Sequence, residues 1–339
     1  MNSIGELAVK PNLFKFASSE LSQDAMLCWL AHWGDPTSAT HDLALHHLGQ
    51  KFLQTVFKKH GRRMPEIVKS IEIKRQYRNI DVLLVINDAI AVCIEDKVGA
   101  TEHSEQLQRY LVGLKEDGFS EDQIIPVYVQ TGEQGSYRGV RAAGYEVMRR
   151  RELIAPFLAY QEQGGSDSIA RDFHDYLTDI EIQTEAFRTQ PLSEWNWRAW
   201  QGFYSELQHQ LGDGEWGYVA NPSGGFIGYW WNWISGGESE KYLQIEQAKL
   251  CFKISVDDAA KRSEQQAFWL ARFLRAASDR SLQVVKPNRI RTGQTMTIVV
   301  LDREYRVVDS RGLLDIAATG EVLRSAADVL NHAIAMESI

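Results

Sequence analysis

Two short apolar runs separated by a polar pair stand out in the first third of the chain. Residues 83–86 and 89–94 are rich in β-branched side chains, and Asn87-Asp88 between them is typical of a tight hairpin turn. We therefore expect two antiparallel strands joined by a two-residue turn, which would pair Ile86 with Ala89.

Charged residues stand at the open end of this hairpin. Asp81 opens the first strand, and Glu95, Asp96 and Lys97 close the second. Because side chains alternate along a strand, Glu95 and Lys97 share one face and Asp96 points away. The expected pairing puts Asp81 level with Asp96 or Glu95, so carboxylates and an ammonium group should meet there.

This grouping of carboxylates and a lysine suits metal-assisted chemistry on phosphate. Two carboxylates a few ångströms apart repel each other, and a divalent cation relieves the repulsion. Oxygen ligands suit Mg²⁺ or Mn²⁺, and a neighbouring lysine can stabilise charge that develops on phosphorus. The alternative for Asp81, Glu95 and Lys97 is an ion-pair cluster that protects a sheet edge from pairing.

Periodicities on either side of the hairpin predict an α/β domain. The apolar strands suggest a sheet that helices cover on both faces. The expected elements are helices over about 19–33 and 41–60, a strand over 67–77, the hairpin, a helix over 103–116, strands over 124–130 and 145–148, and a helix over 151–160.

Other polar residues accompany the charged cluster. Glu20 stands at the start of the first expected helix, where it could also complement the positive helix N-terminus. Gln106 and Tyr110 are four residues apart and share a helix face. Arg75 and Arg78 precede Asp81 closely, and we expect these two arginines to contact the substrate.

The spacing of the charged residues resembles the PD-(D/E)xK nuclease superfamily. Asp81 is followed by thirteen residues and then Glu95-x-Lys97, with Ile80 in place of the family's proline. The resemblance covers residues 18–160 and implies a restriction-endonuclease-like α-β-β-β-α-β core with a mixed sheet. It also implies that the Asp and the Glu bind Mg²⁺ or Mn²⁺ and that the Lys serves the attacking water.

The resemblance extends the expected site. The Gln-x-x-x-Tyr of Gln106 and Tyr110 is similar to a motif near the active site of the exonuclease-like branch. In several branches a Glu like Glu20 on the first helix points toward the metal. The resemblance also implies that the backbone carbonyl of Asp96 completes the ligand set.

The resemblance implies a metal-dependent nuclease that acts on DNA rather than RNA, in restriction or phage defence. A non-cleaving nucleic-acid-binding or regulatory protein on the same fold is the alternative. It would need a lost ligand, and Asp81, Glu95 and Lys97 are all present.

Composition limits the setting. The net charge of −8 argues against a broadly basic surface, so a nucleic-acid partner must be contacted locally. No apolar run approaches the ~18 residues of a membrane span, and the start of the chain lacks a signal-peptide pattern. We expect a cytoplasmic enzyme without a membrane partner; the sequence leaves open whether it forms a homo-oligomer.

The C-terminal part differs in composition from the rest. Seven of the ten tryptophans lie between Trp195 and Trp233. We expect a nuclease core over 1–160, a linker and bridging helix over 161–190, and a smaller tryptophan-rich α+β accessory domain over 191–339 that positions substrate.

The tryptophans could stack on bases, but filling the core is the plainer interpretation. Adjacent Trp230 and Trp231 should face opposite ways on a strand, so at least one should leave the core. Glu246 and Lys249 form a second Glu/Lys pair, but with the wrong spacing for a second active site. We expect strands over 216–219, 226–234, 243–254, 295–301 and 305–308, a strand around Val284, and helices over 196–211, 262–277 and 321–334.

Overall fold

The computed structural model describes residues 10–99, 104–221, 224–289 and 291–336. The chain divides into two compact units, unit 1 (Met1–Ile182) and unit 2 (Gln183–Ile339). In the described parts of both units, no helix is long and apolar enough to cross a membrane.

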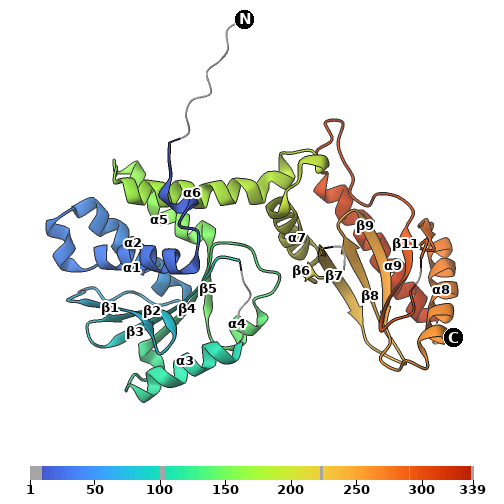
Figure 1. The fold of residues 1–339 in the computed structure, drawn as a ribbon, viewed down its shortest axis with the longest axis horizontal. Coiled ribbons are helices and arrows are strands. Elements are labelled where there is room, and N and C mark those ends of the chain that lie inside the picture. The colour runs from blue at the N-terminus through green and yellow to red at the C-terminus, as the bar shows by residue number, and fades with distance from the viewer. Residues whose placement is uncertain (1–9, 100–103, 222–223, 290, 337–339) are drawn as a thin grey trace, which may run out of the picture. The chain divides into compact units, whose positions relative to one another are not determined.

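Unit 1 is built on a mixed five-stranded sheet (Figure 1). The first three strands are antiparallel neighbours, and the last three are parallel neighbours. The α-β-β-β-α-β order and the mixed sheet agree with the predicted restriction-endonuclease-like core. In spatial order the strands are β1 (Ile71–Tyr77), β2 (Ile80–Ile86), β3 (Ile90–Lys97), β4 (Ile124–Gln130) and β5 (Glu146–Arg149).

Helices cover both faces of this sheet. Val82 and Ile94 belong to a core shared with α1, α2, α5 and α6, whereas Leu83 and Cys93 belong to a second core shared with α3 and α4. Buried positions on both faces explain why β2 and β3 are apolar almost throughout. The helices are α1 (Glu20–Trp33), α2 (Leu43–Lys59), α3 (Ser104–Glu116), α4 (Arg138–Ala142), α5 (Arg150–Glu162) and α6 (Ser168–Glu185).

Unit 2 is an α+β unit with a six-stranded sheet in the order β10-β11-β9-β8-β7-β6. All its described strand pairs are antiparallel. Its helices and strands share one hydrophobic core. The elements are α7 (Trp197–Leu211), β6 (Glu215–Val219), β7 (Phe226–Ile234), β8 (Glu240–Glu246), β9 (Lys249–Ser255), α8 (Arg262–Asp279), β10 (Val284–Val285), β11 (Thr295–Leu301) and α9 (Ile316–Ala335).

Most of the tryptophans of unit 2 fill this core, as the plainer interpretation predicted. Trp231 is buried, whereas its neighbour Trp230 is half-buried on the opposite side of β7. Trp197 and Trp233 are 45% and 47% exposed. The buried members are Trp195, Trp200, Trp216, Trp231 and Trp269.

The predicted register of the β2–β3 hairpin was wrong by one residue. Ile86 pairs with Ile90 and not with Ala89, so three residues form the connection. Asn87 has a left-handed φ of 55°, and its side-chain oxygen accepts a hydrogen bond from the backbone N of Lys69 at 2.6 Å. This contact with a preceding segment anchors the turn, and the sequence of the hairpin alone does not reveal it.

Four further expectations need correction. The expected strand 243–254 is two strands, because Gln247 has a left-handed φ of 53° and turns the chain between β8 and β9. Residues 305–308 contribute only an isolated bridge from Val308 to Leu314. Strand β1 begins at Ile71, whose N–H is held by Asp35 at 3.0 Å. The short helix α4 lies where a loop was expected, and His103, the expected start of α3, lies outside the described residues.

Candidate active site

Lys97 lies at the centre of a group of three carboxylates. Its Nζ atom is 2.7 Å from Glu95 Oε1, 3.7 Å from Asp81 Oδ2 and 3.6 Å from Glu20 Oε2. Asp81 is at the start of β2 and Glu95 near the end of β3, and continuing the register from the Val82–Ile94 pair places them level. The structure therefore brings together four of the residues that the sequence predicted for the site.

The backbone of β3 holds the Asp81 side chain in place. The N–H of Asp96 donates to Asp81 Oδ2 at 2.9 Å, and the amide of Gln76 donates to Asp81 Oδ1 at 3.2 Å. Glu20 Oε1 accepts from the N–H of Val98 at 3.4 Å. These contacts fix two carboxylates toward the lysine.

Negative charge is in excess around Lys97. Burial first, and then the nearby charge of Asp81, raise the pKa of Glu95 to about 8, against the opposing effect of Lys97. Burial alone would lower the pKa of Lys97, but the contact with Glu95 and the charges of Asp81 and Glu20 raise it overall. A site that favours protons on both a carboxyl and an amine favours an added cation for the same electrostatic reason.

Asp96 lies on the opposite face of β3 from Glu95, as the alternation of the strand predicted. Its side chain is fully buried and accepts a hydrogen bond from the amide of Gln23, whose oxygen accepts from Thr131 Oγ1 at 2.8 Å. Burial first, and then the charges of Asp24 and Asp81, hold the pKa of Asp96 well above its usual value. The carbonyl oxygen of Asp96 accepts from Lys97 Nζ at 2.9 Å.

The site expected from the sequence did not include Gln23, Asp24 or Gln76. Asp24 is almost fully buried, and burial raises its pKa to about 6. Gln76 reaches both Asp24 Oδ2 at 3.4 Å and Asp81 Oδ1 at 3.2 Å. The spacing of Gln23 and Asp24 from Glu20, three and four residues along α1, was the signal that could have found them.

Gln106 and Tyr110 join α3 to the site. Their side chains form a hydrogen bond, and Gln106 Nε2 also reaches Glu95 Oε1 at 3.5 Å. Tyr110 is 5% exposed, and burial raises the pKa of its hydroxyl to about 12. The pair therefore reaches the charged cluster as a neutral hydrogen-bonding unit.

The two arginines expected to contact the substrate are not part of the cluster. Arg78 forms ion pairs with Glu116 at 2.9 Å and Asp117 at 2.7 Å, so two carboxylates already match its charge. Arg75 reaches the carbonyl of Leu21 at 3.4 Å. A substrate contact by either arginine stays a prediction.

The residues of the cluster fit a hard divalent cation. Glu95 Oε2 is buried and receives no hydrogen bond from the described residues. The described chain contains no group of three His, Cys, Asp or Glu side chains that is arranged to hold a metal ion by itself. Asp81 and Glu95 would therefore supply the oxygen ligands that Mg²⁺ or Mn²⁺ prefers, with water or substrate completing the shell.

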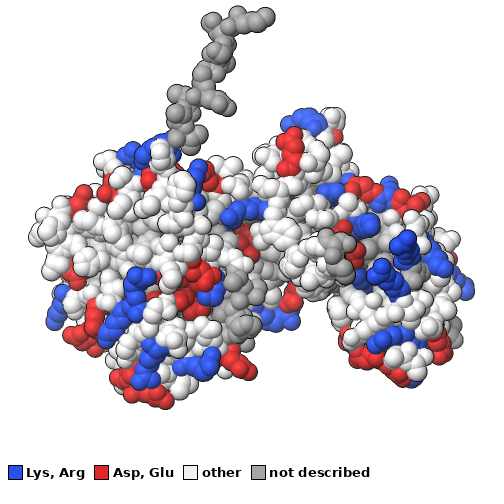
Figure 2. Space-filling view, in the orientation of Figure 1, with Lys and Arg blue, Asp and Glu red and all other residues white. Residues whose placement is uncertain are grey.

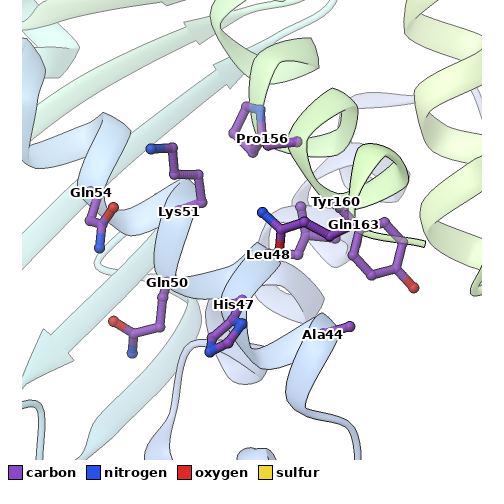
Figure 3. A pocket seen from close by; sticks show the side chains of 10 residues that line it. Ala44, His47, Leu48, Gln50, Lys51, Gln54, Pro156, Tyr160 and Gln163 are labelled. Carbon is purple, nitrogen blue, oxygen red and sulfur yellow. The ribbon is translucent and has the colours of Figure 1, made fainter. Parts of the chain in front are cut away.

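A separate cavity lies between α2 and α5 (Figure 3) and has a volume of about 260 Å³. His47 and Lys51 line it, together with uncharged residues such as Tyr160. It contains none of the predicted site residues, so it is not the candidate active site.

The surface charge is mixed. On the face in Figure 2, basic and acidic side chains are interspersed, which agrees with the expectation that the surface is not broadly basic.

Residues 11–145 match the family model of the PD-(D/E)XK nuclease superfamily. The match covers less than half of the chain, and this part of unit 1 is similar to a PD-(D/E)XK nuclease domain. The match confirms the family resemblance that the spacing of Asp81, Glu95 and Lys97 predicted, and such domains are in general nucleases. Neither the curated proteins nor the solved structures include a significant match to the chain.

Proposed function

We propose that the chain is a metal-dependent nuclease that hydrolyses phosphodiester bonds in DNA. One observation carries the proposal: Asp81, Glu95 and Lys97 converge at one end of the sheet, and no described residue donates a hydrogen bond to Glu95 Oε2. The family match over residues 11–145 supports nuclease chemistry. The preference for DNA over RNA rests on the family resemblance alone.

The residues of the chain would divide the work as follows. Asp81 and Glu95 would hold the cation. Glu20 and the carbonyl of Asp96 would become further ligands only if they move toward it, because no three of the described acidic side chains are already arranged around one metal position. When bound, Mg²⁺ or Mn²⁺ polarises a phosphate oxygen and lowers the pKa of a bound water. Lys97 orients the attacking water and stabilises the negative charge that develops on phosphorus.

The surrounding hydrogen bonds would keep this arrangement in place. The N–H of Asp96 and the amide of Gln76 hold both oxygens of Asp81. Gln106, supported by Tyr110, limits the movement of Glu95. Ligands that are fixed before the substrate arrives need little reorganisation during the reaction, and this lowers its barrier.

We assign unit 2 a role in positioning the substrate. Trp233 is 47% exposed and stacks on Tyr242 with 4.0 Å between ring centroids. Exposed aromatic rings can stack on bases, which contributes ~1–3 kcal/mol per base. Lys286, Arg289 and Arg291 are exposed and could contact phosphates.

The biological setting that the resemblance suggests is restriction or defence against phage. Cells that express the wild-type chain should then form fewer plaques than cells that express Asp81→Asn at the same level. Equal plaque numbers for the two strains across a phage panel would argue against this setting and leave the chemistry open to its own test.

A cleavage assay tests the proposed chemistry. Linear, circular and single-stranded DNA, and an RNA of the same sequence, are incubated with purified protein in Mg²⁺, Mn²⁺ or EDTA. We expect DNA cleavage with either metal, none with EDTA, and none by Asp81→Asn. Cleavage that persists in EDTA or in Asp81→Asn would contradict the proposal.

A further inference from the structure

A groove adjoins the candidate active site on the α3 side of the sheet. It has a volume of about 870 Å³ and lies between α3 and the turn that joins β1 to β2. Gln106 and Tyr110 line it, and Gln106 also contacts Glu95. This groove, here called the α3 groove, therefore shares Gln106 with the candidate active site.

Ion pairs hold the wall of the α3 groove opposite the helix. Arg78 and Asn79 form the two-residue β1–β2 turn, with left-handed φ values of 53° and 67°. Positive φ at both positions is what a two-residue hairpin turn of the I′ type requires, and Asn is common there, whereas Arg is not. The ion pairs of Arg78 with Glu116 and Asp117 join this turn to the α3 side.

Gly113 allows this close approach of the turn to the helix. A Cβ atom at this position would lie 3.3 Å from both Cδ and Nη1 of Arg78, which is closer than ordinary van der Waals contact. The Arg78 side chain therefore lies against the helix where a larger residue would push it away. Arg78 therefore forms one wall of the α3 groove, and the carboxylates of Glu116 and Asp117 balance its positive charge.

Arg109 differs from Arg78 because its guanidinium forms no ion pair with a described residue. It is exposed, it lines the α3 groove, and no ion pair or side-chain hydrogen bond joins it to another described residue. It lies one turn of α3 from Gln106 and next to Tyr110 in the sequence. Its guanidinium is a planar cation, suited to a phosphate, on the groove that Gln106 also lines.

We propose that the α3 groove holds the phosphate backbone of one nucleic-acid strand beside the bond to be cut, with Arg109 as a phosphate-binding residue. This inference rests on the proposed function. A volume of 870 Å³ is that of a pocket for a small ligand, so the α3 groove suits a few nucleotides of a single strand rather than a duplex.

Binding measurements test this inference without relying on cleavage. Fluorescence anisotropy of a fluorescein-labelled single-stranded DNA is followed with the full chain carrying Asp81→Asn, at several salt concentrations. Adding Arg109→Gln should weaken binding about tenfold at low salt. The slope of log affinity against log salt should fall by about 0.7, the value for one lost phosphate contact on a single strand.

Two further variants sharpen the measurement. Arg109→Lys keeps the charge and should recover part of the affinity and the salt slope. Arg141→Gln removes an exposed arginine on α4 that does not line the α3 groove, and it should leave both unchanged. Equal affinities and slopes for Arg109→Gln and Arg141→Gln would overturn the role of Arg109.

Crosslinking locates the strand independently. Val112 lines the α3 groove and is 56% exposed, whereas Leu158 on α5 lies outside it and is 47% exposed. A photoactivatable group on Val112→Cys should crosslink to the DNA at least several times more than the same group on Leu158→Cys. Equal crosslinking at both positions would overturn the placement of the strand.

The failure of this inference and the failure of the proposed function are distinguishable. If the wild type cleaves DNA but Arg109→Gln binds like Arg141→Gln, the α3 groove is not the strand site and the nuclease proposal stands. If the wild type cleaves nothing but the binding and crosslinking results are as expected, the proposed chemistry fails and the strand site stands.

Discussion

Each unit has a lysine–glutamate ion pair on its sheet, and the two pairs are alike in length. Lys97 Nζ lies 2.7 Å from Glu95 in unit 1, and Lys253 Nζ lies 2.8 Å from Glu246 in unit 2. Both lysine side chains are largely buried, at 13% and 11% exposure, but the glutamates differ, at 0% and 25%. The distance between the charges therefore does not distinguish the two sites.

The two sites differ in the charged and polar groups that surround each glutamate. Glu95 lies level with another carboxylate, Asp81, and its Oε2 atom receives no hydrogen bond from the described residues. Glu246 lies level with Lys249, and the amide of Gln244 donates to it at 3.2 Å. Around Lys97 the carboxylates outnumber the positive groups, whereas Glu246 has two lysines beside it. Electrostatics therefore favour an added cation only at the first site.

The buried polar atoms that lack partners among the described residues repeat this contrast. Apart from one tyrosine hydroxyl in each unit, those of unit 1 are all oxygen acceptors and those of unit 2 are all nitrogen donors. In unit 1 they are Asp24 Oδ1, Glu95 Oε2, Asp96 Oδ2 and Gln130 Oε1, and in unit 2 Trp231 Nε1, Arg272 Nη2 and Arg306 Nη1. Three of the four acceptors are in residues close to Asp81, and one of them, Glu95 Oε2, is on the same face of β3 as Lys97.

The largest expected difference is between Glu95→Gln and Glu246→Gln. Loss of a metal ligand should reduce the cleavage rate by about 10³-fold, the upper range for removing one electrostatic contributor. Glu95→Gln should keep or raise thermal stability, because it relieves repulsion with Asp81. Glu246→Gln should cleave like the wild type. Rates and melting temperatures of the purified variants check this, and equal rates for the two variants would remove the distinction between the sites.

The two lysines should differ less strongly. Lys97→Ala should lose about 10²-fold in kcat, because the role proposed for Lys97 is to act on the water and on the developing charge. The Mg²⁺ concentration that gives half-maximal rate should change little, and Lys253→Ala should keep full activity. The result that would refute the role of Lys97 is a full rate restored by saturating Mg²⁺.

The amides beside the two glutamates provide a third comparison. Gln76→Leu removes the donor to Asp81 and Asp24 and should lower kcat by about tenfold, as is usual for residues that orient metal ligands. Gln244→Leu, the matched change beside Glu246, should have no effect on kcat. Steady-state kinetics decide the matter, and an equal loss in both variants would point to a general effect on folding.

The smallest expected effect concerns the exposed tryptophans of unit 2. Trp233→Ala should weaken DNA binding about fivefold, which is near the lower end for loss of one stacked base. Trp197→Ala is the control, because Trp197 on α7 is 45% exposed and also lies beside a tyrosine, Tyr218, but no substrate contact is proposed for it. Anisotropy titrations measure both affinities, and no loss in Trp233→Ala would leave unit 2 without evidence of a substrate contact.

Local sequence predicted the centre of the site because strand geometry is local. Alternation along β3 separates Glu95 and Lys97 from Asp96, and a short hairpin brings Asp81 beside them. The sequence left open whether Glu95 or Asp96 lies level with Asp81, and the register continued from the Val82–Ile94 pair places Glu95 there. The turn itself was harder to predict, because the side chain of Asn87 bonds a segment eighteen residues earlier.

The supporting residues were harder to predict because they depend on packing between elements. Gln23 bonds to Asp96 only because α1 packs against the sheet. Arg78 forms its ion pair with Glu116 only because Gly113 has no side chain that would push Arg78 away from α3. Neither contact can be recognised from the spacing of residues within a single helix or strand. The fold of unit 2 was predicted less well in one respect, since a single left-handed residue, Gln247, divides the one expected strand over 243–254 into two strands.

Calorimetric titration of Mn²⁺ tests the central claim most directly, because it needs neither the substrate nor the reaction. The wild type and Glu246→Gln should bind Mn²⁺ with the same affinity and stoichiometry. Glu95→Gln should bind it at least about tenfold more weakly, as expected when a carboxylate ligand is lost. Wild-type affinity in Glu95→Gln, or a loss confined to Glu246→Gln, would contradict the account.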